Sequence, residues 1–315
     1  MTEAQAAAIV LLLAVALDLA FGDPPNRYHP VAWIGRALAI GRRRLCHGRP
    51  LALLARGAVL ALGVAALAGG AGLALDAVAG RLGIAGLLLQ AVALKSTLGL
   101  RGLAEAATRV AAALERGDLA AARALVGRDL VSRATEDLDE RQVTSAAVES
   151  TAENLTDGFV APLCCFLLFG LPGALVYRAI NTADAILGYR EGPLEHFGKV
   201  AARLDDILNL IPARLSAYAI VLGAPLGGGD VRRALSVMRR DRRLTASPNA
   251  GWTMAAMAGA LGVALEKSGA YRLGDGRLPT APHIRRGVRV VVSAAAILLI
   301  VGLALGLLTL AMSNS

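Results

Sequence analysis

Three carboxylates recur four residues apart in the middle of the chain, at Glu149, Glu153 and Asp157. On an α-helix this spacing places them on one face, where like charges repel each other. The apolar residues 159–169 follow directly, so the carboxylates lie at the edge of an expected membrane segment, where bare charge is costly. A cation would relieve both costs, and magnesium takes oxygen ligands. The stretch is therefore either a magnesium site or a solvated acidic helix end.

A second group of oxygen-bearing and basic side chains follows further along the chain. Its members are Asn181, Asp184, Lys199, Arg203, Asp205, Asp206 and Asn209. Each asparagine stands three residues from an aspartate, so each such pair shares a helix face. The adjacent carboxylates of Asp205 and Asp206 offer ligands for a metal, and the nearby cations offer partners for phosphate. Ordinary ion pairing on a helix surface is the alternative.

A run of arginines precedes residues that favour the start of a helix. Residues 239–243 contain four arginines, beginning with Arg239 and Arg240. Ser247 has the side chain of an N-cap and Pro248 suits the first turn, so we expect a helix to begin there, with Asn249 in its first turn. A helix N-terminus beside arginines suits phosphate. The alternative is a positive cluster that contacts lipid headgroups.

Three single residues are further candidates. His29 lies in the turn-rich segment 22–30, as either a proton carrier or a structural hydrogen-bonding group. Asp18 lies near the end of the first apolar segment, where an acidic side chain is either functional or reaches the interface. Lys95 lies late in the third apolar segment, where it either meets an anionic substrate or extends toward the lipid headgroups.

Composition indicates where these residues act. The 315-residue chain is 56% hydrophobic but only 4% aromatic, whereas soluble domains are about 45–50% apolar. The net charge is +9, and the 33 basic residues are nearly all arginine, which indicates genomic coding bias rather than a nucleic-acid-binding surface. The three cysteines form neither a disulfide framework nor a CxxC metal pair. We therefore expect a membrane protein that binds no nucleic acid.

Six apolar segments have lengths suited to membrane-spanning helices. They are residues 4–21, 56–78, 82–100, 159–177, 208–226 and 288–312. Proline and glycine interrupt the fourth, and Pro212 and Arg214 interrupt the fifth, so we expect both to be kinked or re-entrant. The predicted fold class is all-α, a polytopic membrane protein with about five to six apolar helices.

The polar sections between these segments are expected to lie on the cytoplasmic side. The loop 22–50 is rich in arginine, so the positive-inside rule places it in the cytoplasm and the N-terminus outside. Sections 101–158 and 227–287 are expected to be polar and helical. Local features expected within these sections are a short amphipathic helix at Val31–Arg36 and helix breaks near Gly117 and Gly127. We expect residues 1–315 to form a single integral-membrane domain in which the polar clusters converge.

Several long motifs occur in order along nearly the whole chain. They are Asp18-Leu-Ala-Phe-Gly-Asp23, His29-Pro-Val-Ala-Trp-Ile-Gly35, Glu149-Ser-Thr-Ala-Glu-Asn-Leu-Thr-Asp-Gly158, Tyr177-Arg-Ala-Ile-Asn-Thr-Ala-Asp184, Phe197-Gly-Lys-Val-Ala-Ala-Arg-Leu-Asp-Asp206 and Ser247-Pro-Asn-Ala-Gly-Trp252. In these blocks the sequence resembles the cobalamin biosynthesis protein family CobD/CbiB, the adenosylcobinamide-phosphate synthases.

The resemblance implies an amide-forming ligase in cobalamin biosynthesis. Such an enzyme joins adenosylcobyric acid to an aminopropanol, usually as its O-phosphate, and gives adenosylcobinamide phosphate. It implies ATP and Mg²⁺ as cofactors and a multi-pass location in the bacterial inner membrane. The implied partners are the two substrates and the lipid bilayer, with contact to other late cobalamin-pathway enzymes left open.

Under this resemblance the candidate residues take three kinds of role. The catalytic candidates are Glu149, Glu153, Lys199 and His29. The substrate- and phosphate-binding candidates are Arg203, Arg239, Arg240, Ser247, Asn249 and Asn181. The metal-binding candidates are Glu153, Asp157, Asp184, Asp205 and Asp206.

Two other classes of protein fit part of the pattern. A magnesium-dependent membrane prenyltransferase also uses acidic clusters and a diphosphate, but its acidic repeats are spaced differently from those of this chain. A corrinoid or anion transporter would fit the membrane setting, although the sequence shows no inverted repeat. No Walker A loop, GxGxxG fingerprint, GxSxG elbow or HExxH motif is present.

Overall fold

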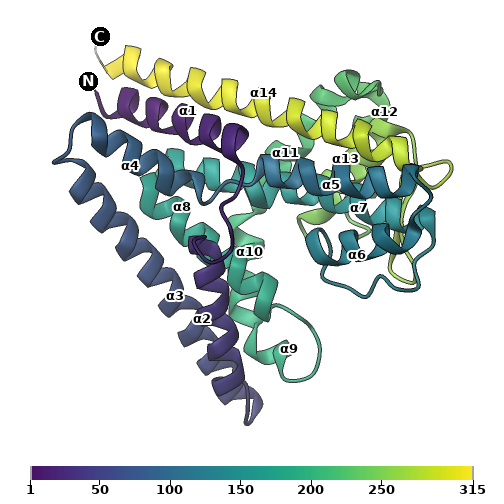
Figure 1. Cartoon of the computed structure of the whole chain (residues 1–315), viewed down its shortest axis with the longest axis horizontal. Coiled ribbons are helices and arrows are strands. Elements are labelled where there is room, and N and C mark those ends of the chain that lie inside the picture. The colour runs from purple at the N-terminus through teal and green to yellow at the C-terminus, as the bar shows by residue number, and fades with distance from the viewer. Residues whose placement is uncertain (1, 314–315) are drawn as a thin grey trace. The chain divides into compact units, whose positions relative to one another are not determined.

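The computed structural model describes residues 2–313, which are almost entirely helical (Figure 1). The elements in chain order are α1 Glu3–Phe21, α2 Pro30–Leu45, α3 Pro50–Ala79, α4 Ile84–Lys95, α5 Leu100–Glu115, α6 Leu119–Asp129, α7 Glu140–Leu155, the π-helical turn η1 Thr156–Val160, α8 Ala161–Leu187, α9 Leu194–Phe197, α10 Lys199–Leu208, α11 Leu210–Gly223, the 3₁₀ turn η2 Ala224–Gly227, α12 Val231–Asp241, α13 Ala250–Leu261, β1 Leu265–Lys267, β2 Tyr271–Leu273 and α14 Ala281–Ser313. The all-α prediction is confirmed.

Within the described residues, six helical stretches are long and apolar enough to cross a membrane. They are Ala4–Phe21, Pro50–Ala79, Ile84–Glu115, Glu140–Leu187, Leu210–Gly227 and Ala281–Ala304. Each contains most of one of the six apolar segments expected from the sequence. In α3, large apolar side chains such as Val59, Leu67 and Leu73 are exposed, as suits a helix whose solvent is lipid. The chain is therefore a multi-pass membrane protein.

The chain folds into two compact units. The first contains residues 2–99, 161–209 and 303–313, and the second contains residues 100–160 and 210–302. The chain alternates between the two units along its sequence. Helix α8 of the first unit follows directly from η1 of the second, and α10 of the first unit is followed by α11 of the second. The expectation of a single domain stays a prediction.

In the first unit, α3 packs along α8, and α1 packs against α4 (Figure 1). A core of Leu38, Leu187 and Phe197 joins α2, α8 and α9. Gly57 of α3 is buried, and a Cβ atom there would overlap the backbone oxygen of Phe197, so glycine allows α3 to lie against α9. The expected interruption of the fourth apolar segment is confirmed, because Gly170 breaks α8 with a φ of 67°.

In the second unit, α13 is buried among α7, α11 and α12. The short antiparallel hairpin of β1 and β2 packs on α7 and α13, with Glu266 opposite Arg272. Gly259 lets α12 and α13 approach closely, because a Cβ atom there would lie 2.7 Å from the Cα of Ala234. The hairpin is the one part of the second unit that the all-α prediction did not include.

Local boundaries differ from the sequence prediction in three places, each for a physical reason. The short helix expected at Val31–Arg36 is the longer α2, whose last turn carries three arginines that suit a helix C-terminus. Within the third apolar segment, helix α4 ends at Lys95, where the hydroxyls of Ser96 and Thr97 each donate to a carbonyl of the preceding turn.

Gly127 does not break a helix, although Gly117, with a φ of 76°, does. Gly127 lies inside α6, where a Cβ atom would lie 2.7 Å from Oγ1 of Thr135, so this glycine serves close packing. The second break follows at 130–139. The two glycines look alike in the sequence as helix breakers. The backbone conformation and the packing around each decide which one ends a helix.

Candidate functional site

Glu149 of the second unit is buried and fully engaged by hydrogen bonds. Its carboxylate accepts from Ser145 Oγ at 2.7 Å and from the Tyr271 hydroxyl at 2.8 Å, and Arg133 Nη2 lies 4.0 Å away. Ser145 Oγ also accepts the backbone N–H of Glu266 at 2.8 Å. The interpretation of this position as a solvated helix end is wrong, because Glu149 ties the hairpin to α7 and is only 5% exposed.

Glu153 and Asp157 lie further along the same helical stretch and are half-buried. Asp157 belongs to the π-helical turn η1, a feature that often occurs at functional sites. Burial and the carboxylates of Glu149 and Glu153 raise the pKa of Tyr271 above its usual value. The Tyr271 hydroxyl therefore stays protonated and donates to the carboxylate of Glu149.

The first unit holds the second acidic group, on α8 and α10. Asp205 accepts from Asn181 Nδ2 at 3.1 Å and from Asn209 Nδ2 at 3.0 Å. Asn209 in turn accepts from the buried Tyr177 hydroxyl at 3.0 Å. Burial raises the pKa of Asp205, and the adjacent charge of Asp206 raises it further. Burial also raises the pKa of Asp206, against the opposing charges of Arg203 and Arg190.

A cavity of about 230 Å³ opens beside Asp206 in this unit. Its lining includes Arg190, Glu195, Lys199, Arg203 and Asp206. Lys199 and Arg203 are four residues apart on α10, so they present their cations on the same face. Three cations and two carboxylates line this small cavity, and the excess of positive charge suits an anionic group such as phosphate.

The structure thus brings together Lys199, Arg203 and Asp206, as the sequence predicted. Asn181 and Asp184 lie on α8, and Asp205 lies on α10 within hydrogen-bonding distance of Asn181. Arg190 and Glu195 were not predicted, since they lie in a polar loop and a one-turn helix without a motif. Their only signal in the sequence was position between two predicted blocks.

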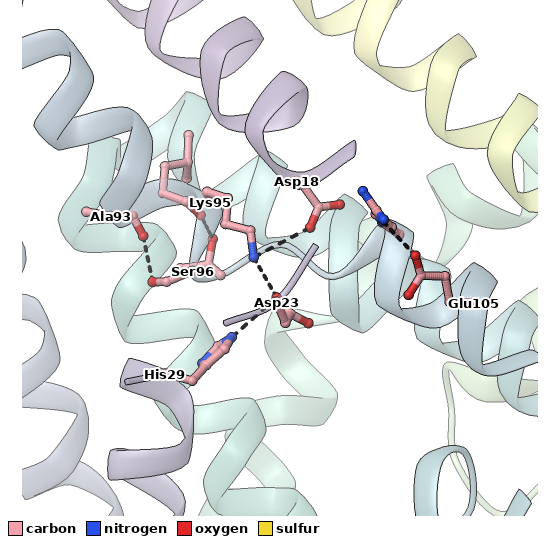
Figure 2. A network of polar contacts seen from close by, with 10 residues as sticks. Asp18, Asp23, His29, Ala93, Lys95, Ser96 and Glu105 are labelled. Atoms are coloured by element: carbon pink, nitrogen blue, oxygen red, sulfur yellow. Dashed lines mark hydrogen bonds and ion pairs between the residues drawn. The ribbon is translucent and has the colours of Figure 1, made fainter. Parts of the chain in front are cut away.

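The first unit also contains a charged network at the end of α1 (Figure 2). Lys95 Nζ lies 2.7 Å from Asp23 Oδ1 and 3.9 Å from Asp18 Oδ1. Burial opposes ionisation of Asp23, but hydrogen bonds from His29 and Lys95 outweigh it and lower the pKa of Asp23 to about 2. Lys95 is 8% and Asp18 1% exposed, so both side chains are enclosed by protein rather than extended toward lipid headgroups. Asp23 was not singled out from the sequence.

His29 caps α2 in this network. Its Nδ1 accepts the backbone N–H of Val31 at 3.2 Å, so the proton of the neutral ring is on Nε2 and is directed at Asp23 Oδ1, 3.4 Å away. This arrangement is that of a structural hydrogen-bonding group. The catalytic role of His29 stays a prediction.

Within the arginine run at residues 239–243, the structure gives carboxylate partners to Arg240. Arg240 donates to both oxygens of Asp241, at 2.6 and 2.9 Å, and to Asp275 at 3.0 Å. The Arg240 hydrogen bond lowers the pKa of Asp241, which also accepts from Gly274 N–H at 2.7 Å. Arg240 therefore ties α12 to the loop after β2, while Arg239 is exposed.

The helix expected to begin at Pro248 begins at Ala250. The predicted capping residue is nevertheless engaged, because Ser247 Oγ accepts the N–H groups of Asn249 and Ala250 at 3.2 and 3.3 Å. Asn249 Oδ1 accepts from Arg214 Nη1 at 2.8 Å. The structure adds Arg214, a residue that no motif indicated.

Within the described residues, no three His, Cys, Asp or Glu side chains lie close enough together to hold a metal ion by themselves. Magnesium is often bound by one or two carboxylates, with water and phosphate oxygens completing its shell. Asp206 lines the cavity and offers one such carboxylate, whereas both oxygens of Asp205 accept from asparagines, so the metal role of Asp205 stays a prediction. The metal roles of Glu153, Asp157 and Asp184 stay predictions.

Six apolar helices and these charged clusters define a polytopic α-helical membrane protein. A family described as CobD/Cbib protein matches residues 11–309. The chain is 43% identical over 276 residues to cobalamin biosynthesis protein CobD of Dehalococcoides mccartyi (strain CBDB1), covering 87% of this chain and 89% of the relative. It is 42% identical over 265 residues to the protein of the same name from Brucella suis biovar 1 (strain 1330), covering 82% and 81%.

The chain therefore belongs to the CobD/Cbib family of cobalamin biosynthesis proteins. A probable cobalamin biosynthesis protein CobD of Methanothermobacter thermautotrophicus is 43% identical over 266 residues, covering 84% of this chain and 86% of the relative. No solved structure matches the chain.

Proposed function

We propose that this protein forms the amide bond between adenosylcobyric acid and aminopropanol, or its O-phosphate, with ATP, in the bacterial inner membrane. The observation that carries the proposal is the cavity lined by Arg190, Lys199 and Arg203 together with the carboxylates of Glu195 and Asp206. In a member of the CobD/Cbib family, such a cavity suits a phosphoryl group and its counter-ion.

The chemistry requires activation because a carboxylate and an ammonium group do not condense at neutral pH. In the proposed first step, a carboxylate oxygen of adenosylcobyric acid attacks the γ-phosphorus of ATP, and ADP leaves. In the second step, the neutral amine attacks the acyl carbon, phosphate leaves with the carbon–oxygen bond electrons, and the amine loses a proton to a base. Cations that offset the charge on the moving phosphoryl group lower the barrier of the first step.

Residues of the cavity fit these needs. Lys199 and Arg203 offset phosphoryl charge, and Arg190 extends the same cationic lining. Asp206, which lines the cavity, would hold Mg²⁺ together with phosphate oxygens, and Asp205 is the second candidate ligand beside it. Magnesium supplies charge neutralisation at the phosphates when bound. Asn181 and Asn209 orient Asp205 through their amide groups.

The acceptor of the amine proton is proposed among Glu149, Glu153 and His29. Glu149 and His29 are engaged in the structural hydrogen bonds described above. Glu153 is half-buried, and its carboxylate stays one of the three candidates.

The test is an assay with purified protein, adenosylcobyric acid, aminopropanol phosphate, ATP and Mg²⁺, in which each component is omitted in turn. We expect amide and ADP in equal amounts only with all four present. Asp206→Asn should lower turnover at least about 100-fold, the scale of losing one group that stabilises transition-state charge. Glu191→Gln is the matched control, since Glu191 is exposed and does not line the cavity.

A second measurement separates binding from turnover. Mg²⁺ should raise the thermal unfolding temperature of the wild type and of Glu191→Gln, but not that of Asp206→Asn. Near-normal turnover of Asp206→Asn would exclude this cavity as the site. Release of diphosphate instead of ADP would contradict the proposed first step.

A further inference from the structure

The ring of Trp252 in the second unit lies against two arginines from other segments. The guanidinium carbon of Arg214, on α11, lies 4.7 Å from the ring centroid, and that of Arg242, just after α12, lies 4.8 Å from it. Both distances are within the range of cation–π attraction. The end of α12 and the distant helix α11 thus each bring one positive charge to the ring of Trp252.

Within residues 2–313, these two cations lack the carboxylate partners that Arg240, in the same arginine run as Arg242, has. Among the residues that the structure describes, neither guanidinium lies within 4.0 Å of a carboxylate, whereas Arg240 has two such partners and Arg272 and Arg285 have one each. Like charges held at one ring repel each other, and an anion between or beside them would remove that cost.

Both guanidinium groups are fixed in place and keep donors to spare. Arg214 Nη1 donates to the Leu210 carbonyl at 2.7 Å and to Asn249 Oδ1, and Arg242 Nη1 donates to the Arg239 carbonyl at 2.7 Å. A guanidinium has five N–H donors. The bonds seen here use the Nη1 group of each arginine, so the other nitrogens can serve a ligand.

The backbone at the start of α13 is committed to another partner. Ser247 Oγ accepts the N–H groups of Asn249 and Ala250, which are the groups that an anion at the helix start would use. Gly251 lets the helix lie directly against Arg242, because a Cβ atom there would overlap the Arg242 carbonyl oxygen. The arginines rather than the helix terminus are therefore the donors for an anion.

We propose that Arg214, Arg242 and the face of Trp252 form a binding site for a phosphate group. The two forked cations suit a phosphomonoester dianion, which accepts several hydrogen bonds. This inference rests on the proposed function for the identity of the ligand, the phosphate of aminopropanol phosphate. A lipid headgroup phosphate could bind in the same way, because Arg214 belongs to the candidate membrane span Leu210–Gly227.

Trp252 itself reports on the site, because the chain has only two tryptophans. A Trp33→Phe background leaves Trp252 as the single tryptophan, and the emission of that protein is measured in nanodiscs of zwitterionic lipid. We expect a saturable change with aminopropanol phosphate and with inorganic phosphate, and none with chloride at equal ionic strength.

In this background, Arg242→Gln and Arg214→Gln should each weaken phosphate binding at least about tenfold, the loss expected for a charge-assisted hydrogen bond. Arg242→Lys should weaken it less because the charge is kept. Arg243→Gln is the matched control, since Arg243 is exposed and adjacent in sequence. The helical circular dichroism of each variant checks its folding.

The outcomes decide between the alternatives. An unchanged phosphate affinity in Arg242→Gln and Arg214→Gln, or no phosphate response of Trp252, would overturn the site. A response to phosphatidylglycerol nanodiscs that free phosphate cannot compete with supports the phosphate site but assigns it to lipid. Phosphate binding without amide formation would refute the proposed function alone, and amide formation without binding at Trp252 would refute this inference alone.

Discussion

Replacing Lys95 with methionine should destabilise the first unit strongly, because one ammonium group compensates two carboxylates. Lys95 Nζ lies 2.7 Å from Asp23 and 3.9 Å from the buried Asp18. Methionine keeps the length of the side chain but removes its charge. Breaking a buried ion pair by removing one partner costs about 3–5 kcal/mol. Since the Asp23 side chain is 39% exposed, we expect about 3 kcal/mol.

The same network predicts a smaller loss of stability for Asp23→Asn than for Lys95→Met. The pKa of Asp23 falls from its usual 3.8 to about 2, which corresponds to about 2.5 kcal/mol at about 1.4 kcal/mol per unit. Solvent screening of the exposed carboxylate reduces this to about 1 kcal/mol. His29 and Lys95 keep an oxygen acceptor in this variant, and Asp18 keeps its cation. Lys95→Met should therefore cost more than Asp23→Asn.

The measurement is unfolding in mixed detergent micelles, followed by helical circular dichroism, for Lys95→Met, Asp23→Asn and the double variant. Because the two residues share one network, the double variant should lose less than the two single variants added together. The folded pKa of Asp23 is depressed, so its contribution is present above about pH 4 and is lost as the pH falls toward 2. Asp23→Asn should lack this acid-induced loss.

Two results would refute the reasoning. The first is a Lys95→Met protein within about 0.5 kcal/mol of the wild type, the range of ordinary surface substitutions. The second is strict additivity of the two single variants, which would show that Lys95 and Asp23 do not interact energetically.

Two further predictions concern packing and the hairpin. Gly57→Ala should lower the free energy of unfolding in detergent by about 1–3 kcal/mol, because the added methyl overlaps the Phe197 carbonyl. Gly63→Ala, with open space at its Cβ, should be neutral, and equal stability of the two variants would contradict the close approach. Tyr271→Phe removes the hydroxyl that donates to the buried Glu149 and should lower the free energy of unfolding by about 1–3 kcal/mol. It should also increase protease cleavage within residues 265–273. Unchanged cleavage would show that this hydrogen bond does not hold the hairpin.

The membrane-spanning part of the fold could be predicted from the sequence because it depends on local composition. A helix in lipid satisfies its own backbone, so a run of apolar residues is sufficient to indicate a span. The six apolar segments therefore correspond to the six candidate spans. Residues that share a face of one helix, such as Lys199 and Arg203, could be predicted for the same reason.

The partners of the charged residues could not be predicted, since they come from distant parts of the chain. Lys95 is 72 residues from Asp23, and Glu149 is 122 residues from Tyr271. No periodicity connects such pairs. The hairpin that carries Tyr271 has strands of only three residues, too short for an alternating pattern to show.

Charge compensation separates residues that look equivalent in the sequence. Arg240 and Arg242 belong to one arginine run, yet Arg240 is held by two carboxylates whereas Arg242 stacks on Trp252. A phosphate at Arg240 would have to displace Asp241 and Asp275, so the attraction gained would be offset by the ion pairs lost. A phosphate at Arg242 would instead relieve repulsion from Arg214. The arginine run thus contains one cation that is held in ion pairs and one that, in the described part of the chain, has no carboxylate partner and binds the phosphate in our proposal. The distinction lies in which carboxylates the fold brings to each one.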